Sequence, residues 1–117
     1  MNKPISPKLH GILDYAVVGM LAVLPASLGL KKGAVGSYAA VATNYLAVNS
    51  LTDTPVGIKK VLTFKAHQKA DIATLGMLAI MTMAPAIRKD KKALYFHVGF
   101  MAMVATQYLL TDFEAKA

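Results

Sequence analysis

The sequence contains no cysteine, which excludes disulfides, thiolate metal ligands and thiol redox chemistry. Acidic residues are also scarce, since six Asp and Glu stand against 13 Lys and Arg and give a formal net charge of +7. In a soluble protein this charge would suggest nucleic-acid binding, but no basic stripe with interleaved aromatic residues is present. The lysines instead flank apolar segments, where they can anchor to anionic lipid headgroups. We therefore predict a lipid bilayer, and not nucleic acid, as the partner of this chain.

Sequence motifs that carry catalysis are missing as well. There is no Gly-rich phosphate loop, no hydrolase arrangement of Ser, His and Asp, no His-Glu-x-x-His motif and no pair of glycosidase carboxylates. The methionines form no Met-x-x-Met ladder with a mouth of His or Cys, as a copper pathway would require. We predict that the protein is not an enzyme and carries no cofactor.

What the sequence does have is long stretches without charge. Hydrophobic residues make up 56% of the chain, charged residues 16%, and the mean hydropathy is +0.47. Segments free of Lys, Arg, Asp and Glu cover residues 15–30, 34–52, 72–87 and 93–111. The first and third can be extended backwards through residues 9–14 and 66–71, which brings each segment close to the roughly 20 residues that cross a bilayer. We predict four transmembrane helices, the first retained and not cleaved as a signal peptide.

The chain also resembles itself. A shift of 57 residues superimposes nine identities within residues 3–22, and a shift of 59 aligns Leu51-Thr52-Asp53 with Leu110-Thr111-Asp112. The nine identical positions are Lys3, Lys8, His10, Asp14, Ala16, Gly19, Met20, Leu21 and Ala22. We interpret this as an internal duplication within a single membrane domain, 1–117, with one repeat at about 3–56 and the other at about 60–115.

Each repeat is expected to be a helical hairpin. Ser6 ahead of Pro7, and Thr63 in the second repeat, are typical helix N-caps. Charged and turn residues at 30–33 and 87–92 predict the two hairpin loops, and residues 52–57 end the second helix. Because two helices return the chain to its starting side, both repeats have the same orientation. The predicted fold is all-α, a four-transmembrane-helix bundle with pseudo-two-fold symmetry along the membrane normal.

The most chemically distinctive residues fall at one end of this bundle. His10 and Asp14, like His67 and Asp71, are four residues apart and share a helix face. By the hairpin topology, Asp53 and Asp112 end on the same side of the membrane. The candidate metal or proton site therefore comprises His10, Asp14, Asp53, His67, Asp71 and Asp112.

Two other interpretations of these residues stay open. Each Asp could pair with the neighbouring His, or with Lys8, Lys65 or Lys69, and so pin one hairpin to the other. Two histidines at matching depth could also ligate a haem iron from opposite faces. The cation interpretation predicts that His10 and His67 lie within about 5 Å of a common point together with Asp53 or Asp112.

Several stretches of the chain resemble a known family. They are residues 5–15 (Ile-Ser-Pro-Lys-Leu-His-Gly-Ile-Leu-Asp-Tyr), 24–30 (Leu-Pro-Ala-Ser-Leu-Gly-Leu), 51–57 (Leu-Thr-Asp-Thr-Pro-Val-Gly) and 64–67 (Phe-Lys-Ala-His). This pattern resembles the SPW-repeat proteins, small bacterial membrane proteins with a duplicated helical hairpin. The segments 24–27 and 83–86 stand where their Ser-Pro-Trp motif would, and this chain has no Trp. The resemblance implies a bacterial inner membrane and transfers no activity.

These observations lead to one principal hypothesis and one rival. The principal hypothesis is a non-enzymatic structural or accessory membrane subunit that associates with itself or with another membrane protein. The rival is a protein that binds a cation or conducts protons or ions through the His and Asp layer. Seven lysines on the side of the termini, against six Lys and Arg on the other, favour both termini in the cytoplasm.

Overall fold

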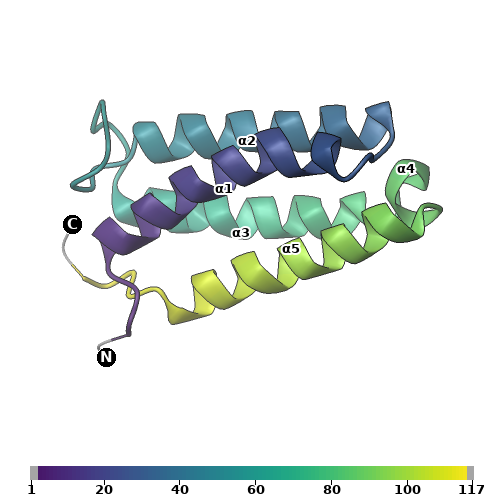
Figure 1. Ribbon diagram of the computed structural model, residues 1–117. Coiled ribbons are helices and arrows are strands. Elements are labelled where there is room, and N and C mark those ends of the chain that lie inside the picture. The colour runs from purple at the N-terminus through teal and green to yellow at the C-terminus, as the bar shows by residue number, and fades with distance from the viewer. Residues whose placement is uncertain (1–2, 116–117) are drawn as a thin grey trace.

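The computed structural model describes residues 3–115, and all the regular secondary-structure elements in that range are helices. The long helices are α1 (Pro7–Ser27), α2 (Lys32–Ser50), α3 (Phe64–Met81) and α5 (Lys91–Leu110), and a single turn, α4 (Pro85–Arg88), precedes the last of them. They run up and down as two hairpins (Figure 1). Both chain ends and the α2–α3 linker lie at one end of the bundle, which we call the linker end. Lys116, one of the lysines counted on this side, lies outside the described residues.

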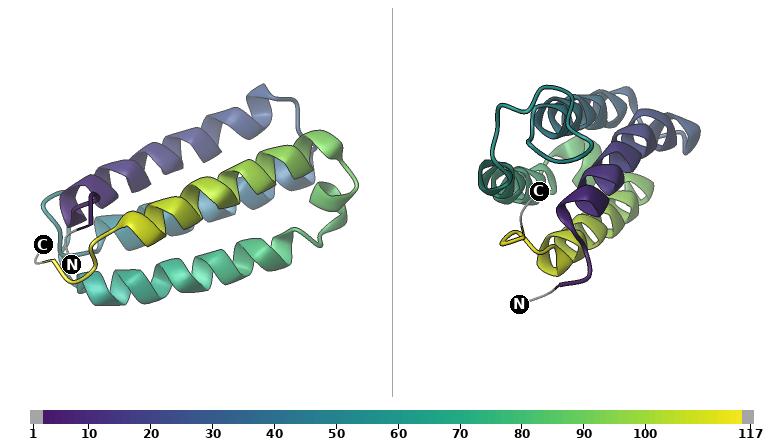
Figure 2. Two further views of the ribbon diagram at one scale, coloured as in Figure 1. Left: turned by 90° about the horizontal axis from the view of Figure 1, so that it is seen from below. Right: turned by 90° about the vertical axis from the view of Figure 1, so that its left-hand side faces the viewer.

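Seen from the linker end, the long helices surround a common axis, with α1 and α3 across the bundle from each other (Figure 2, right). The core along this axis is apolar and contains, among others, Val17, Leu21, Leu78 and Phe100. The all-helical fold is thus confirmed for the described part of the chain.

The helix starts follow from local chemistry. The Ser6 hydroxyl accepts a hydrogen bond from the Leu9 N–H at 3.1 Å, and Pro7 occupies the first turn, where its missing N–H costs nothing. The Thr63 hydroxyl accepts from the Ala66 N–H at 3.0 Å in the same way. Both N-caps predicted from the sequence are confirmed.

The end of the third helix differs from the prediction. The uncharged segment was expected to continue to Ile87, but α3 ends at Met81 and the chain turns before α4 begins at Pro85. Pro85 lacks the N–H that would extend the helix, and a proline disfavours helical backbone at the preceding residue. Ala84 accordingly has extended backbone, with φ −65° and ψ 136°. The predicted segment was defined by the absence of charged residues, and this criterion does not detect a helix break at an uncharged proline.

Two of the helices, α1 and α5, are long and apolar enough to cross a membrane. The other two do not meet the same criterion, so the prediction of four spans is supported for two. In α3 the reason is that Lys65, Lys69 and Asp71 all fall in its first eight residues. Large apolar side chains nevertheless lie exposed along the bundle, among them Val23 (59%), Ile80 (76%) and Leu109 (65%).

At the end of the bundle opposite the linker, a buried histidine connects neighbouring helices by hydrogen bonds. His97 Nε2 donates to the carbonyl oxygen of Leu78 at 2.7 Å, which leaves Nδ1 to accept from the Tyr38 hydroxyl at 2.7 Å. A carbonyl can only accept, so this assignment follows from the partner. Tyr38 on α2, His97 on α5 and Leu78 on α3 thereby connect three helices.

Candidate metal centre

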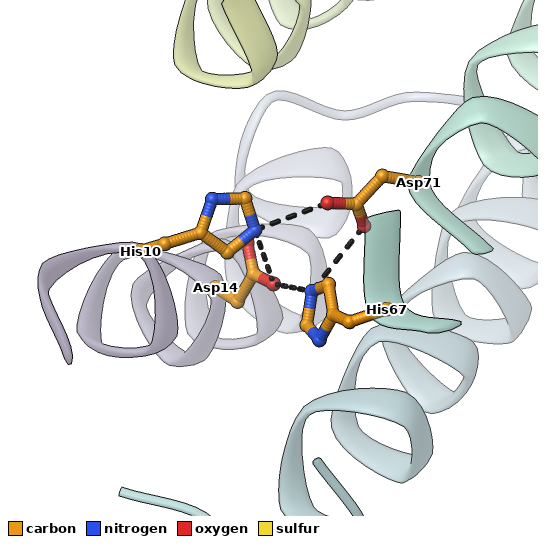
Figure 3. A group of neighbouring side chains, drawn as sticks. All are labelled: His10, Asp14, His67 and Asp71. Atoms are coloured by element: carbon orange, nitrogen blue, oxygen red, sulfur yellow. Dashed lines mark hydrogen bonds and ion pairs between the residues drawn. The ribbon is translucent and has the colours of Figure 1, made fainter. Parts of the chain in front are cut away.

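Four side chains from α1 and α3 converge near the linker end of the bundle (Figure 3). His10 and Asp14 are one turn apart on α1, and His67 and Asp71 are one turn apart on α3. One potential ligand atom from each residue lies within 4.8 Å of all the others. His10, His67 and Asp14 are at most 2% exposed, and the Asp71 side chain is 14% exposed. The i to i+4 spacing predicted the pairs, and the bundle brings the two pairs together.

Each imidazole faces both carboxylates. His10 Nε2 lies 3.3 Å from Asp14 Oδ2 and 3.1 Å from Asp71 Oδ2. His67 Nε2 lies 2.9 Å from Asp14 Oδ2 and 3.4 Å from Asp71 Oδ1. The pairs between helices are even closer than the pairs within one helix, so these residues form one cluster and not two separate His–Asp pairs.

Two threonines determine which nitrogen of each histidine faces the cluster. The Thr111 hydroxyl donates to the Gln107 carbonyl at 2.6 Å, so it must accept the proton of His10 Nδ1, which lies 2.8 Å away. Thr52 holds His67 in the same way, with Nδ1 to Oγ1 at 2.8 Å. Both Nδ1 atoms are thus protonated donors, and both Nε2 atoms point inwards.

The backbone places these threonines. Residues just ahead of α1 and α3 pair with the segments that follow α5 and α2, in isolated bridges Ile5–Thr111 and Leu62–Thr52. The Asp112 N–H donates to the Ile5 carbonyl at 2.9 Å, and the Asp53 N–H donates to the Leu62 carbonyl at 2.7 Å. Each histidine is therefore held by a threonine from the other hairpin.

Asp53 and Asp112, predicted as site residues, are not part of the cluster, and the two histidines converge with Asp14 and Asp71 instead. Asp53 is exposed, and Asp112 is half-buried with Oδ1 accepting from the Glu114 N–H at 3.1 Å. Side chains alternate in extended backbone, so when the Thr of each Leu-Thr-Asp motif points inwards the neighbouring Asp points away. Lys65, considered as a partner for an Asp, pairs instead with Glu114.

Sequence reasoning missed three residues that contact the cluster. Thr52 and Thr111 hold the histidines, and the Gln107 side-chain amide donates to Asp14 Oδ1 at 2.8 Å. The repeated Leu-Thr-Asp motif carries a signal for the threonines as well as for its Asp. Gln107 had no such signal, because the aligned position in the first repeat is Val48.

Because the threonines accept the Nδ1 protons of His10 and His67, the charge balance at the centre of the cluster depends on what lies between Nε2 and the carboxylates. Neutral imidazoles protonated on Nδ1 direct an Nε2 lone pair at two carboxylates, an arrangement that is repulsive unless positive charge lies between them. His10 Nε2 and Asp71 Oδ2 are buried and have no hydrogen-bond partner, although they are only 3.1 Å apart. A divalent cation or two additional protons would balance the two carboxylates.

The dimensions of the cluster come close to those of a small metal site. Tetrahedral zinc, with bonds of about 2.0–2.2 Å to nitrogen and oxygen, separates neighbouring ligand atoms by about 3.3–3.6 Å. The two His–Asp separations within a helix, 3.3 and 3.4 Å, fall in this range, and the two between helices, 3.1 and 2.9 Å, are shorter and lie at hydrogen-bond distance. Haem does not fit, because the imidazole centroids of His10 and His67 are only 5.0 Å apart and both carboxylates face the same centre.

Comparisons with protein-family models, with curated proteins and with solved structures found no match. The similarity to SPW-repeat proteins accordingly stays a prediction, and the cluster itself is the basis for a proposed function.

Proposed function

We propose that this chain is a small membrane protein of four transmembrane helices that binds a divalent transition-metal ion between its two hairpins. The observation that carries the proposal is the convergence of His10, Asp14, His67 and Asp71, with both Nε2 atoms turned towards two carboxylates. A divalent ion would neutralise the two carboxylates and accept both lone pairs. The alternative is two imidazolium rings with centroids 5.0 Å apart, whose charges the same two carboxylates would balance, with His67 Nε2 donating to Asp14 Oδ2 at 2.9 Å.

The donor set favours a transition metal, with Zn²⁺ the best match. Calcium and magnesium bind oxygen ligands almost exclusively, whereas imidazole nitrogen together with carboxylate oxygen suits zinc and the neighbouring first-row metals. Two threonine hydroxyls orient the imidazoles through Nδ1, an arrangement typical of histidines that bind metals. Asp14 is oriented in turn by Gln107.

The spaces beside the cluster support binding without catalysis. Two cavities of about 10 Å³ flank it, one lined by His10 and Asp14 and the other by His67 and Asp14. Each holds about one water molecule and no organic substrate. A non-enzymatic role, in which the ion joins the two hairpins of a structural or accessory subunit, agrees with these dimensions.

Four membrane spans are supported by helix length. Helices α2 and α3 contain 19 and 18 residues. At 1.5 Å per residue they are about 27–29 Å long, close to the hydrocarbon thickness of a bilayer, which is about 30 Å. The charged residues of α3 are confined to its start, where the linker end would meet the lipid headgroups. In this topology the cluster lies one to two turns below the membrane surface.

Zinc binding by the purified protein tests the proposal. The wild-type protein, stripped with chelator in mild detergent and dialysed against Zn²⁺, should bind about one ion per chain. The double variant His10→Ala/His67→Ala should bind at least about 100-fold more weakly, because half of the donor atoms are lost. Circular dichroism of both proteins checks that they are folded.

The control is His97→Gln, which removes a buried histidine at the opposite end of the bundle while retaining an amide donor for Leu78. It should leave zinc stoichiometry and affinity unchanged. A folded wild-type protein that binds no zinc, or a double variant that binds as tightly as wild type, would refute the metal centre and favour the paired-charge interpretation.

A further inference from the structure

Access to the proposed metal centre is restricted on every side. Along the bundle, a groove of about 200 Å³ lies between α2 and α3, and an apolar groove of about 430 Å³ lies between α1 and α5. Both grooves run beside the small cavities that flank the cluster, sharing Thr74 with one cavity and Gln107 with the other. In the proposed topology these grooves face hydrocarbon, so a metal ion could use them only at a high desolvation cost.

The remaining route leads through the linker end, which is closest to the cluster. His10 is the fourth residue of α1 and His67 the fourth residue of α3, so each lies only about 5 Å along its helix from the first residue. Water and headgroups are therefore nearer to the cluster through this end than through any other.

Two aromatic rings close this end. The Phe64 and Phe113 rings pack against each other with centroids 5.0 Å apart, and their centroids lie 5.6 and 5.5 Å from the His10 imidazole. Both phenylalanines are only 7% exposed. Phe64 precedes His67 by one turn, and Phe113 follows the threonine that holds His10. The rings thus cover the cluster from the linker side.

The two rings are held very differently. Phe64 is the first residue of α3, fixed behind the Thr63 N-cap. Phe113 lies beyond the end of α5, in a turn formed by residues 112–115. That turn is held by the Asp112 N–H bond to Ile5 and by the pairing of Glu114 with Lys65, whose side chains are 78% and 51% exposed. An exposed ion pair contributes little to stability. The Phe113 ring also packs on Tyr108 of α5, with centroids 5.1 Å apart, so moving Phe113 breaks ring contacts but no hydrogen bond within a helix.

We propose that residues 112–115 form a lid, with Phe113 as its plug, through which the metal ion enters and leaves the His10–Asp14–His67–Asp71 centre from the linker side of the membrane. The inference rests on the proposed metal site and adds the route by which the ion reaches it and the segment that controls the rate of exchange. The lid covers the centre whether or not the ion is bound, so it governs the rates of exchange more than the affinity.

Exchange kinetics test the lid. In Phe113→Ala, zinc association and chelator-driven zinc release should both accelerate by about tenfold or more, while the dissociation constant changes by less than about threefold. The matched control, Phe96→Ala, removes a ring at the opposite end of the bundle, where it packs on Tyr38. It should leave both rates unchanged.

A second variant closes the lid instead of opening it. Because the chain has no cysteine, Lys65→Cys/Glu114→Cys provides a unique pair that a short bis-maleimide can join. The cross-linked protein should exchange zinc at least about tenfold more slowly than the same variant without cross-linker.

The outcomes separate the two proposals. If wild-type protein binds no zinc, the metal centre is wrong. If wild-type protein binds zinc but both the Phe113 variant and the cross-linked protein exchange it at the wild-type rate, the centre stands and the lid is refuted. Loss of affinity in Phe113→Ala with an unchanged association rate would also refute the lid, since Phe113 would then only support the scaffold.

Discussion

At the scale of single residues, the cluster depends on hydroxyl groups that cannot themselves reach its centre. Thr52 and Thr111 each donate to a carbonyl one turn earlier and so present only an acceptor to the imidazole. This directs the Nδ1 proton of each histidine outwards and turns Nε2 inwards. Without the threonine acceptor, each imidazole could rotate or change tautomer, and its Nδ1 would be buried without a partner.

The first residue-scale prediction concerns Thr111→Val, which preserves the side-chain shape and removes the hydroxyl. Zinc affinity should fall by about 10- to 100-fold, as is usual when the group orienting a metal-bound histidine is removed. Competition with a fluorescent zinc chelator in detergent measures the change. Thr111→Ser restores the hydroxyl and should recover most of the affinity. Equal affinities for the Val variant and wild type would show that the threonine does not orient the histidine.

Much of the cluster could be predicted from residue spacing. The i to i+4 separation of His and Asp is local, and a helix places both on one face whatever the tertiary structure. The orientation of Asp53 and Asp112 depends instead on the backbone bridges of the preceding threonines. Thr111 pairs with Ile5 near the other end of the chain, and Thr52 pairs with Leu62 across the linker. Spacing alone cannot distinguish the inward from the outward member of an extended Thr-Asp pair.

At the scale of elements, the α2–α3 linker is as important as the helices because it carries Thr52 to His67. The linker folds back tightly at Gly57, whose N–H donates to the Thr54 carbonyl at 3.0 Å. A Cβ atom at Gly57 would lie 1.9 Å from the Thr52 carbonyl oxygen. No side chain can occupy this position unless the backbone carrying Thr52 moves.

Gly57→Ala should therefore destabilise the protein and weaken the metal centre together. We expect a loss of about 1–3 kcal/mol and a reduced zinc affinity, because Thr52 shifts away from His67. The control is Gly36→Ala on α2, where a Cβ meets nothing within 4 Å and where alanine should stabilise the helix by about 0.5–1 kcal/mol. Thermal unfolding in detergent compares them. A Gly57 variant as stable as wild type would contradict the tight linker.

Element boundaries were predictable where local chemistry determines them. Ser6 and Thr63 act as N-caps as the sequence indicates, since a cap depends on residues within one turn. The break before α4 depends on Pro85, yet Pro25 lies inside α1 without ending it until Ser27. The two prolines differ in effect because the chain turns before Pro85 and continues as a helix through Pro25. Amino-acid composition does not predict this difference.

At the scale of the whole molecule, buried polar contacts join the helices at both ends. The cluster joins α1 to α3 at the linker end, and Tyr38 with His97 joins α2 to α5 at the other. Between them the core is apolar, and large apolar side chains also cover much of the outside. An outside of this kind suits lipid.

We therefore expect the protein to stay in the membrane fraction after alkaline carbonate washing and to require detergent for extraction. A protein that is released by carbonate, or that is monomeric and folded in plain buffer, would contradict the four-span topology.

The global arrangement was the least accessible to sequence reasoning. Apolar segments and the repeat predicted a helical bundle, and the described residues form one. The charge pattern predicted four spans, of which α1 and α5 are long and apolar enough to cross a membrane by themselves. How α1 and α3 face each other is decided by packing between helices far apart in sequence, so the merging of two local His–Asp pairs into one centre required the structure.

X-ray absorption at the zinc edge of the loaded protein tests the central claim most directly. We predict a shell of about four nitrogen and oxygen ligands at about 2.0–2.1 Å, with the multiple-scattering pattern of two imidazoles. A shell of six oxygens at longer distance with no imidazole signature would show that zinc binds elsewhere and would contradict the proposed centre.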